Sequence, residues 1–205
     1  MKNVCLVTFK YISLTSRLTN HNTNCYDLYI MQAMLLLKET LEKNADSSHF
    51  LFTAEDFYSL FPDFSIENLR MLLSRASKNG TLERVCKGIY LYPKAKYDSS
   101  IVLFKTASRL RANCLNYVSL ESVLSQSGAI SQQLLGWITI MTTGRSGIIK
   151  CSRFGTIEFI HTAKTTEKIM PHLRLDTWTG MWWADEELAL RDMRDGKREM
   201  ELVNV

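Results

Sequence analysis

The sequence predicts an α+β protein with two domains: an N-terminal winged helix-turn-helix followed by a smaller mixed α/β, β-rich C-terminal domain. Its 205 residues exceed the roughly 150 of a typical domain. Helical periodicity dominates the first half of the chain, and short β-prone runs dominate the second half. We expect residues 1–27 to be a poorly ordered extension and residues 28–93 to be the winged helix. Residues 94–205 should form the second domain, with a helix, antiparallel strands and a terminal helix.

Composition excludes several classes of protein. The chain is 46% hydrophobic and 22% charged, which is typical of a globular protein. Its five cysteines include no C-x-x-C pair, so neither a disulfide framework nor a zinc site is indicated, and we expect no metal and no cofactor. No apolar run approaches the roughly 20 residues of a membrane-spanning helix, and the apolar patch before Lys10 is too short for a secretory signal. A cytoplasmic protein without a membrane partner is expected.

The first domain begins with a helix. Residues 1–27 are polar and turn-like in their second half, whereas Met31 opens a much cleaner helical pattern. We expect the leading segment to be an extension, with a misassigned start as the alternative. From Leu28 to about Lys43, apolar residues recur at helical spacing and form one stripe. The stripe consists of Ile30, Met34, Leu37 and Leu41.

Two further helices follow in this domain. Thr53 is a suitable N-cap for a short helix that Pro62 ends. Ser65 caps a third helix, and Asn79 and Gly80 stop it because both residues tolerate the left-handed conformation. Helix, short helix, tight turn and helix is the order of a helix-turn-helix.

A hairpin completes the winged variant. Residues 81–85 and 89–92 are β-prone and are joined by residues 86–88, whose last member is glycine. Pro93 closes the hairpin.

Positive charge is concentrated in one stretch of the chain. Residues 65–113 hold ten Lys or Arg against three Asp or Glu, a net charge of +7, whereas residues 1–64 carry −2 and residues 114–205 carry −1. Such a block is typical of a protein that contacts the phosphate backbone. A solvated basic surface is the alternative, but it does not explain why the charge coincides with the helix-turn-helix and hairpin. We therefore predict double-stranded DNA as a partner.

The third helix carries the side chains that suit DNA recognition. Recognition helices contact base edges mainly from their first turns, and Lys or Arg further along meet phosphates. Arginine can pair bidentately with guanine, and asparagine with adenine. The predicted DNA-binding residues are Ser65, Asn68, Arg70, Met71, Ser74, Arg75 and Lys78 on the helix, and Arg84 and Lys87 on the hairpin.

The second domain alternates short helices and strands. Asp98 or Ser99 starts a helix that continues to about Leu110, and Ser119 is a plausible cap for a short helix through Leu124. A last helix is expected over residues 185–193. β-prone runs lie between the helices, at residues 137–141, 147–151 and 156–160.

Other chemically suggestive residues have simpler interpretations. Residues 142–147 could cradle a phosphate but match no nucleotide-binding fingerprint, so a hairpin turn is favoured. The acidic residues 185–187 could serve a metal or catalysis, but they suit the positive end of a helix better. The three tryptophans within residues 178–183 could stack on bases or pack in the core. Nothing indicates an activated thiolate at Cys86, and no catalytic arrangement emerges, so no enzyme is predicted.

The order of these pieces resembles the AbiEi family over roughly residues 28–195. The resemblance rests on LRMLLSRASKNGTLERVCKGIYLYP, YVSLESVLSQSGAI, TTGRSG and ADEELALRDM. The YVSLES block and residues 187–192 are more specific than the winged helix, which many regulators share. The given sequence ends soon after that last motif, so we expect the fuller carboxy-terminal helical region of longer members to be reduced or absent.

The resemblance implies a function. AbiEi proteins are antitoxins and autoregulators of type IV, abortive-infection toxin–antitoxin systems in phage defence. A member is expected to repress its own operon at promoter DNA with inverted repeats, and to counteract a nucleotidyltransferase-like toxin, with direct contact left open. Two alternatives remain: an orphan regulator without a toxin, and a nucleic-acid-processing enzyme whose basic block binds substrate. A neighbouring toxin gene would distinguish the antitoxin from the orphan.

Overall fold

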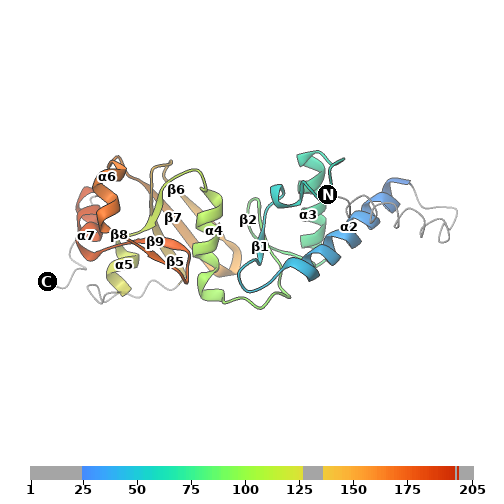
Figure 1. The fold of residues 1–205 in the computed structure, drawn as a ribbon, viewed down its shortest axis with the longest axis horizontal. Coiled ribbons are helices and arrows are strands. Elements are labelled where there is room, and N and C mark those ends of the chain that lie inside the picture. The colour runs from blue at the N-terminus through green and yellow to red at the C-terminus, as the bar shows by residue number, and fades with distance from the viewer. Residues whose placement is uncertain (1–24, 127–135, 197, 199–205) are drawn as a thin grey trace. The chain divides into compact units, whose positions relative to one another are not determined.

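The computed structural model describes residues 25–126, 136–196 and 198 (Figure 1). The extension expected at residues 1–27 lies almost wholly outside these residues. The chain divides into two compact units: Met1–Arg84 with Tyr90–Tyr97, and Val85–Ile89 with Asp98–Val205. Each unit is described by itself.

The first unit combines helices with a small sheet. Helices α2 (Cys25–Asn44) and α3 (Ile66–Lys78) flank strand β1 (Leu51–Phe52) and the 3-10 turn η1 (Glu55–Phe57) in the chain. Strands β2 (Glu83–Cys86) and β3 (Ile89–Leu91) complete a three-stranded sheet of order β1-β3-β2.

Two features of this unit differ from the expectation. The short second helix is only a 3-10 turn, because few residues separate Thr53 from Pro62 and the chain turns again at once. Strand β1 was not expected, since two residues carry no periodicity; it pairs antiparallel with β3, Leu51 opposite Leu91.

The core of the first unit lies between α2 and α3. The expected stripe of α2 is buried through Leu37 and Leu41. Aromatic residues from the segment between the helices pack against the same cluster. They are Phe52, Phe57, Phe61 and Phe64. This packing fixes which face of α3 is turned inward.

The second unit contains a six-stranded sheet of order β6-β7-β5-β4-β9-β8. Its strands are β4 (Asn116–Val118), β5 (Trp137–Thr142), β6 (Gly147–Cys151), β7 (Gly155–His161), β8 (Leu173–Asp176) and β9 (Met181–Ala184).

The sheet is mixed, which corrects the expectation of antiparallel strands. β5 pairs parallel with β7, and β4 pairs parallel with β9. β7 lies between β5 and β6, so residues 142–147 connect two strands that are not neighbours and do not form the expected hairpin turn. Such pairings are set by contacts far apart in the sequence, which local turn signals do not reveal.

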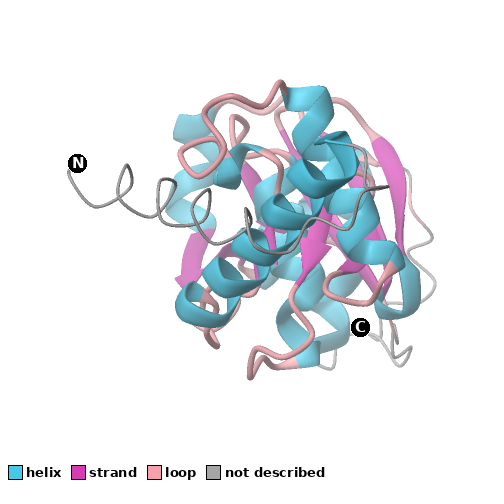
Figure 2. Ribbon diagram, turned by 90° about the vertical axis from the view of Figure 1, so that its right-hand side faces the viewer, coloured by secondary structure: helices cyan, strands magenta, loops and turns pink. Residues whose placement is uncertain are grey.

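Figure 1 shows helices on both sides of this sheet, and Figure 2 distinguishes helices from strands by colour. The ring centroid of Trp183 in β9 lies 5.5 Å from that of Phe104 in α4 (Val102–Leu110), so α4 covers the face to which Trp183 points. Successive strand residues point to opposite faces. Trp182 therefore faces the other way, as does Tyr117, which pairs with it and whose hydroxyl reaches α7 (Glu186–Asp195). Helix α5 (Glu121–Gln126) packs against α7.

The helix ends of the second unit follow the sequence with one exception. Asp98 accepts a hydrogen bond from the Ser100 amide and starts the 3-10 turn η2 (Ser99–Ile101), which continues into α4. Ser119 does not cap α5, because its hydroxyl donates instead to Asp192. Between β7 and α7, the sequence did not reveal α6 (Thr166–Ile169), the 3-10 turn η4 (Met170–His172), β8 or β9.

Candidate nucleic-acid interface

Helix α3 is anchored at its start and along one side. The side chain of Ser65 accepts a hydrogen bond from the Asn68 amide, 3.2 Å away, as an N-cap does. Leu69, Leu72 and Leu73 are buried against the core. The opposite face of the helix is consequently held towards solvent in a defined orientation.

The predicted DNA-binding residues of the first unit are accessible. Ser74 is half-buried, and the others are exposed: Ser65, Asn68, Arg70, Met71, Arg75, Lys78 and Arg84. Lys87 is exposed in the turn between β2 and β3, within the segment Val85–Ile89 that groups with the second unit. Accessibility is what DNA contact requires, and the contacts themselves stay a prediction.

Arg70 has one ion-pair partner that it could readily exchange. Its guanidinium lies 3.9 Å from the carboxylate of Glu55, and the two side chains are 62% and 59% exposed. Exposed pairs of this kind contribute at most about 1 kcal/mol. A guanine edge or a phosphate could therefore replace Glu55 at little cost.

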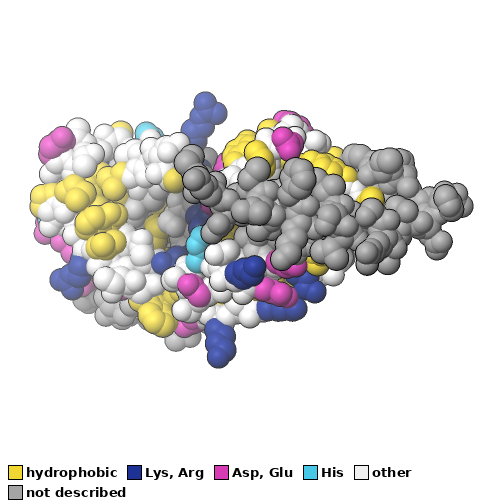
Figure 3. Space-filling view, turned by 45° about the vertical axis from the view of Figure 1, so that its right-hand side comes forward, with side chains coloured by type: hydrophobic (Ala, Val, Ile, Leu, Met, Phe, Trp, Pro, Cys, Tyr) yellow, Lys and Arg dark blue, Asp and Glu magenta, His cyan; other side chains and the backbone are white. Residues whose placement is uncertain are grey.

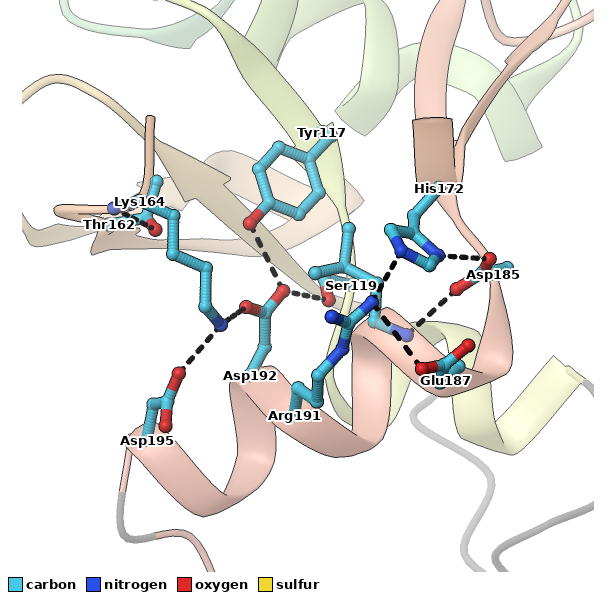
Figure 4. Close-up of polar contacts among 11 residues, drawn as sticks. Tyr117, Ser119, Thr162, Lys164, His172, Asp185, Glu187, Arg191, Asp192 and Asp195 are labelled. Carbon is cyan, nitrogen blue, oxygen red and sulfur yellow. Dashed lines mark hydrogen bonds and ion pairs between the residues drawn. The ribbon is translucent and has the colours of Figure 1, made fainter. Parts of the chain in front are cut away.

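A second polar site lies in the interior of the second unit (Figure 4). The carboxylate of Asp192 is fully buried, and one of its oxygens accepts hydrogen bonds from Tyr117, at 3.1 Å, and Ser119, at 2.7 Å. The ammonium of Lys164 lies 2.6 Å from the other oxygen and 2.7 Å from Asp195. We call these five residues the Asp192 network.

The surroundings of Tyr117 and Lys164 keep these two members of the Asp192 network in their ordinary charge states. Burial, together with the charge of Asp192, raises the pKa of Tyr117, so its hydroxyl stays a donor. Burial alone would lower the pKa of Lys164, but the two carboxylates raise it above its usual value. Each oxygen of Asp192 has a donor, so the network is suited to holding strand β4 and helix α7 together rather than to chemistry.

This network joins the two more specific motifs of the resemblance. Tyr117 and Ser119 belong to YVSLES, and Asp192 ends the motif at residues 187–192. No role for these side chains was predicted from the sequence, and Lys164 lies outside both motifs. The two motifs were visible as letters, but nothing local indicated that they meet.

The acidic residues 185–187 occupy the start of α7, as helix capping requires. Asp185 accepts a hydrogen bond from the Leu188 amide at 2.7 Å and lies 2.7 Å from the imidazole of His172. Burial raises the pKa of Asp185, but these hydrogen bonds outweigh it and hold the pKa below its usual value. Arg191 reaches both His172 and Glu187. In the part of the chain that the structure describes, no group of three His, Cys, Asp or Glu is placed to hold a metal.

Hydrogen bonds from other residues of the second unit hold the glycine-rich segment 142–147 in place. His161 contacts it twice, through the Gly144 carbonyl at 2.8 Å and the Ser146 hydroxyl at 2.9 Å. Arg111 donates to the carbonyl of Arg145. A Cβ on Gly144 would come within 2.9 Å of the Cys114 sulfur. These contacts favour a structural connection over a phosphate cradle.

The remaining candidates have different surroundings. Trp182 and Trp183 are half-buried, whereas Trp178 is 62% exposed. Cys86 is buried.

The first unit has the features of a nucleic-acid-binding regulatory domain: an anchored helix with exposed cationic side chains beside a small sheet. Residues 39–93 match the family model described as "Transcriptional regulator, AbiEi antitoxin". The resemblance to the AbiEi family is thereby confirmed for this segment, about a quarter of the chain, which includes α3 and all nine predicted DNA-binding residues. The family is regulatory and is not known for enzymatic activity.

One further comparison is negative. No curated protein matches the sequence. Among the described residues, no helix combines the length and apolar character needed to cross a membrane.

Proposed function

We propose that this protein is a DNA-binding antitoxin of a type IV toxin–antitoxin system, acting in phage defence. It represses its own operon through a winged helix-turn-helix in which α3 is the recognition helix. It also counteracts a nucleotidyltransferase-like toxin. The observation that carries the proposal is the exposed face of α3, which lies within the segment that matches the family.

The chemistry of that face supports DNA recognition. Asn68, Arg70 and Met71 are exposed on the first turns of α3, where a recognition helix reads base edges. Lys78 is exposed at the other end, where a cation would meet a phosphate. The Ser65 cap and the buried leucines hold α3 in place, so that its exposed face keeps one orientation.

The toxin-directed role is assigned to the second unit. Its residues from 114 onwards are nearly neutral, and its interior is organised around the Asp192 network, which joins both specific motifs of the resemblance. The alternative is an orphan regulator. A neighbouring gene for a nucleotidyltransferase-like protein, and growth rescue on co-expression, would support the antitoxin; absence of both would favour the orphan.

Gel shifts on the promoter fragment and on scrambled DNA of equal length test the DNA-binding role. Arg70→Ala should weaken binding to the promoter by about 1–3 kcal/mol. It should weaken binding to scrambled DNA much less, because a lost base contact affects only the specific complex. Lys78→Ala should weaken both complexes about equally, because a phosphate contact carries no sequence information.

Lys43→Ala is the matched control, because it removes one exposed lysine from the last turn of α2 in the same unit. It should leave both affinities nearly unchanged. Unaltered promoter affinity in the Arg70→Ala, Lys78→Ala double variant would exclude α3 as the recognition helix.

A further inference from the structure

Strand β8 is the last strand on one side of the six-stranded sheet. It pairs antiparallel with β9 through Leu173–Asp176, and no other described strand pairs with its outer edge. An edge of this kind presents backbone N–H and C=O groups that can bind another strand.

Both faces of β8 are open. Leu175 is 49% exposed and points to the side of the sheet that α7 covers, because it lies opposite Trp182. Arg174 is exposed on the α4 side, where it lines a hollow of about 530 Å³ with Asp176 and Trp183. The side chain of Arg174 makes no ion pair or hydrogen bond with any described residue. Neither side chain is explained by packing within the unit.

The sequence of β8 is complementary to itself when two copies run antiparallel. If the two strands are centred on Leu175, Arg174 of each copy lies opposite Asp176 of the other on the same face. Two opposite-charge pairs form in this way, and Leu175 meets its counterpart on the other face. Hydrogen bonds from the side chain and amide of Thr179 hold the pKa of Asp176 below its usual value, so it is charged at neutral pH.

We propose that β8 pairs with β8 of a second copy of this chain around a two-fold axis at Leu175, joining the two sheets into one continuous sheet. A two-fold contact of this kind uses the same surface on both copies and closes as a dimer. The opposite edge strand, β6, is not suited to the same contact, because it carries Lys150 and no carboxylate.

Exposed apolar side chains next to β8 extend the contact. A pair of four-residue strands buries less area than a standard stable interface. Trp178 lies two residues after the strand and is 62% exposed, and Met170 lies three residues before it and is 38% exposed. Figure 3 shows hydrophobic side chains gathered on the second unit, at the left of the view. Burial of such apolar side chains adds a hydrophobic contribution to the free energy of association.

The inference does not depend on the proposed DNA binding. A two-fold dimer nevertheless carries two copies of α3, and two-fold symmetry in a protein is matched by inverted repeats in its DNA.

Sedimentation equilibrium of the full chain tests the dimer. The wild type should be dimeric in the range of about 10–100 µM. Arg174→Glu places like charges opposite Asp176 twice and should raise the dimer dissociation constant at least about tenfold. Lys150→Glu makes the same charge change on β6 and should leave the constant unchanged. A wild type that stays monomeric throughout this range, or a Lys150→Glu effect equal to that of Arg174→Glu, would overturn the proposal.

Cross-linking tests the register. Leu175 is the one position of β8 that faces itself across the proposed axis, so Leu175→Cys should form a disulfide-linked dimer on mild oxidation. Ile148→Cys introduces a thiol of similar exposure on β6, where Ile148 is 60% exposed, and should not cross-link. Mass spectrometry of the linked peptides separates these products from those of the native cysteines. Equal cross-linking of both variants, or none at Leu175→Cys, would refute the pairing.

Discussion

Asp192 shows how a single buried charge can organise its surroundings. A fully buried carboxylate is costly unless it is paired and hydrogen-bonded. Tyr117, Ser119 and Lys164 satisfy it from segments that are remote in sequence. Hydrogen bonds to a buried charge are worth more than neutral ones, so loss of this carboxylate should be costly. Tyr117 and Ser119 lose this acceptor, and Lys164 keeps Asp195 alone.

Asp192→Asn should destabilise the second unit by about 2–4 kcal/mol, because the lysine loses its buried counter-charge and an amide donor faces other donors. Asp195→Asn is the matched control: it removes the other partner of Lys164, which is 65% exposed, and should cost less than about 1 kcal/mol. Urea unfolding followed by tryptophan fluorescence measures both, because all four tryptophans lie in the second unit. Equal losses in the two variants would show that burial of Asp192 has no special weight.

Asp185 makes the stability of the second unit depend on pH. Its pKa is lower in the folded state than in the unfolded chain, so its stabilising effect is present above about pH 4 and is lost as the pH falls through the folded pKa. Asp185→Asn keeps a good N-cap but cannot titrate. The tryptophan unfolding midpoint of this variant should therefore fall less between about pH 5 and pH 3 than that of the wild type. Glu186→Gln, on the same helical turn, should follow the wild type.

At the scale of elements, local sequence signals predicted the helices, whose formation depends on residues close together in the chain. Helix α3 was predicted from its cap, Ser65, and helix α7 from the acidic residues that suit a helix start; apolar spacing supported both. The exposed basic face of α3 was predicted from the same helical spacing. These features depend on residues only three or four positions apart.

The sheet order could not be obtained in this way. β7 enters between β5 and β6, and β9 joins β4 from a distant part of the chain. These arrangements depend on packing between remote residues, so the Asp192 network was equally hidden. The short strands β1, β8 and β9 have too few residues for a periodic signal.

The start of β7 requires a glycine. Gly155 has a φ of +123°, and a Cβ there would lie 1.9 Å from the carbonyl oxygen of Gly136. Gly155→Ala should therefore destabilise the sheet by more than about 3 kcal/mol, since both the backbone conformation and the close approach are lost. At Gly147, the first residue of β6, a Cβ would meet nothing nearer than Arg111 at 3.8 Å. Gly147→Ala should keep the tryptophan unfolding midpoint close to that of the wild type, and a similar loss in both variants would contradict this account.

Net charge is distributed unevenly along the whole chain. The net excess of positive charge lies in residues 65–113, while residues 114–205 are nearly neutral. We infer that repression and protection from the toxin depend on different parts of the protein.

Full-length variants can separate these two activities in cells that carry a promoter reporter and the toxin. The Arg70→Ala, Lys78→Ala double variant should lose repression and keep protection, because it leaves the second unit intact. Asp192→Asn should lose protection at temperatures where the second unit is weakened, while the purified protein still binds the promoter. A well-folded double variant that fails to protect would show that the two activities share one surface.

The Asp192 network also bears on the order in which the chain acquires its structure. The hydrogen bond from Tyr117 to Asp192 spans 75 positions, so the second unit cannot close until α7 has been synthesised. The first unit draws its core from segments that have all left the ribosome much earlier, and domains generally fold as units from the N-terminal end. Contacts between remote residues also form slowly. During translation, the part proposed to bind DNA should therefore mature before the part proposed to act against the toxin.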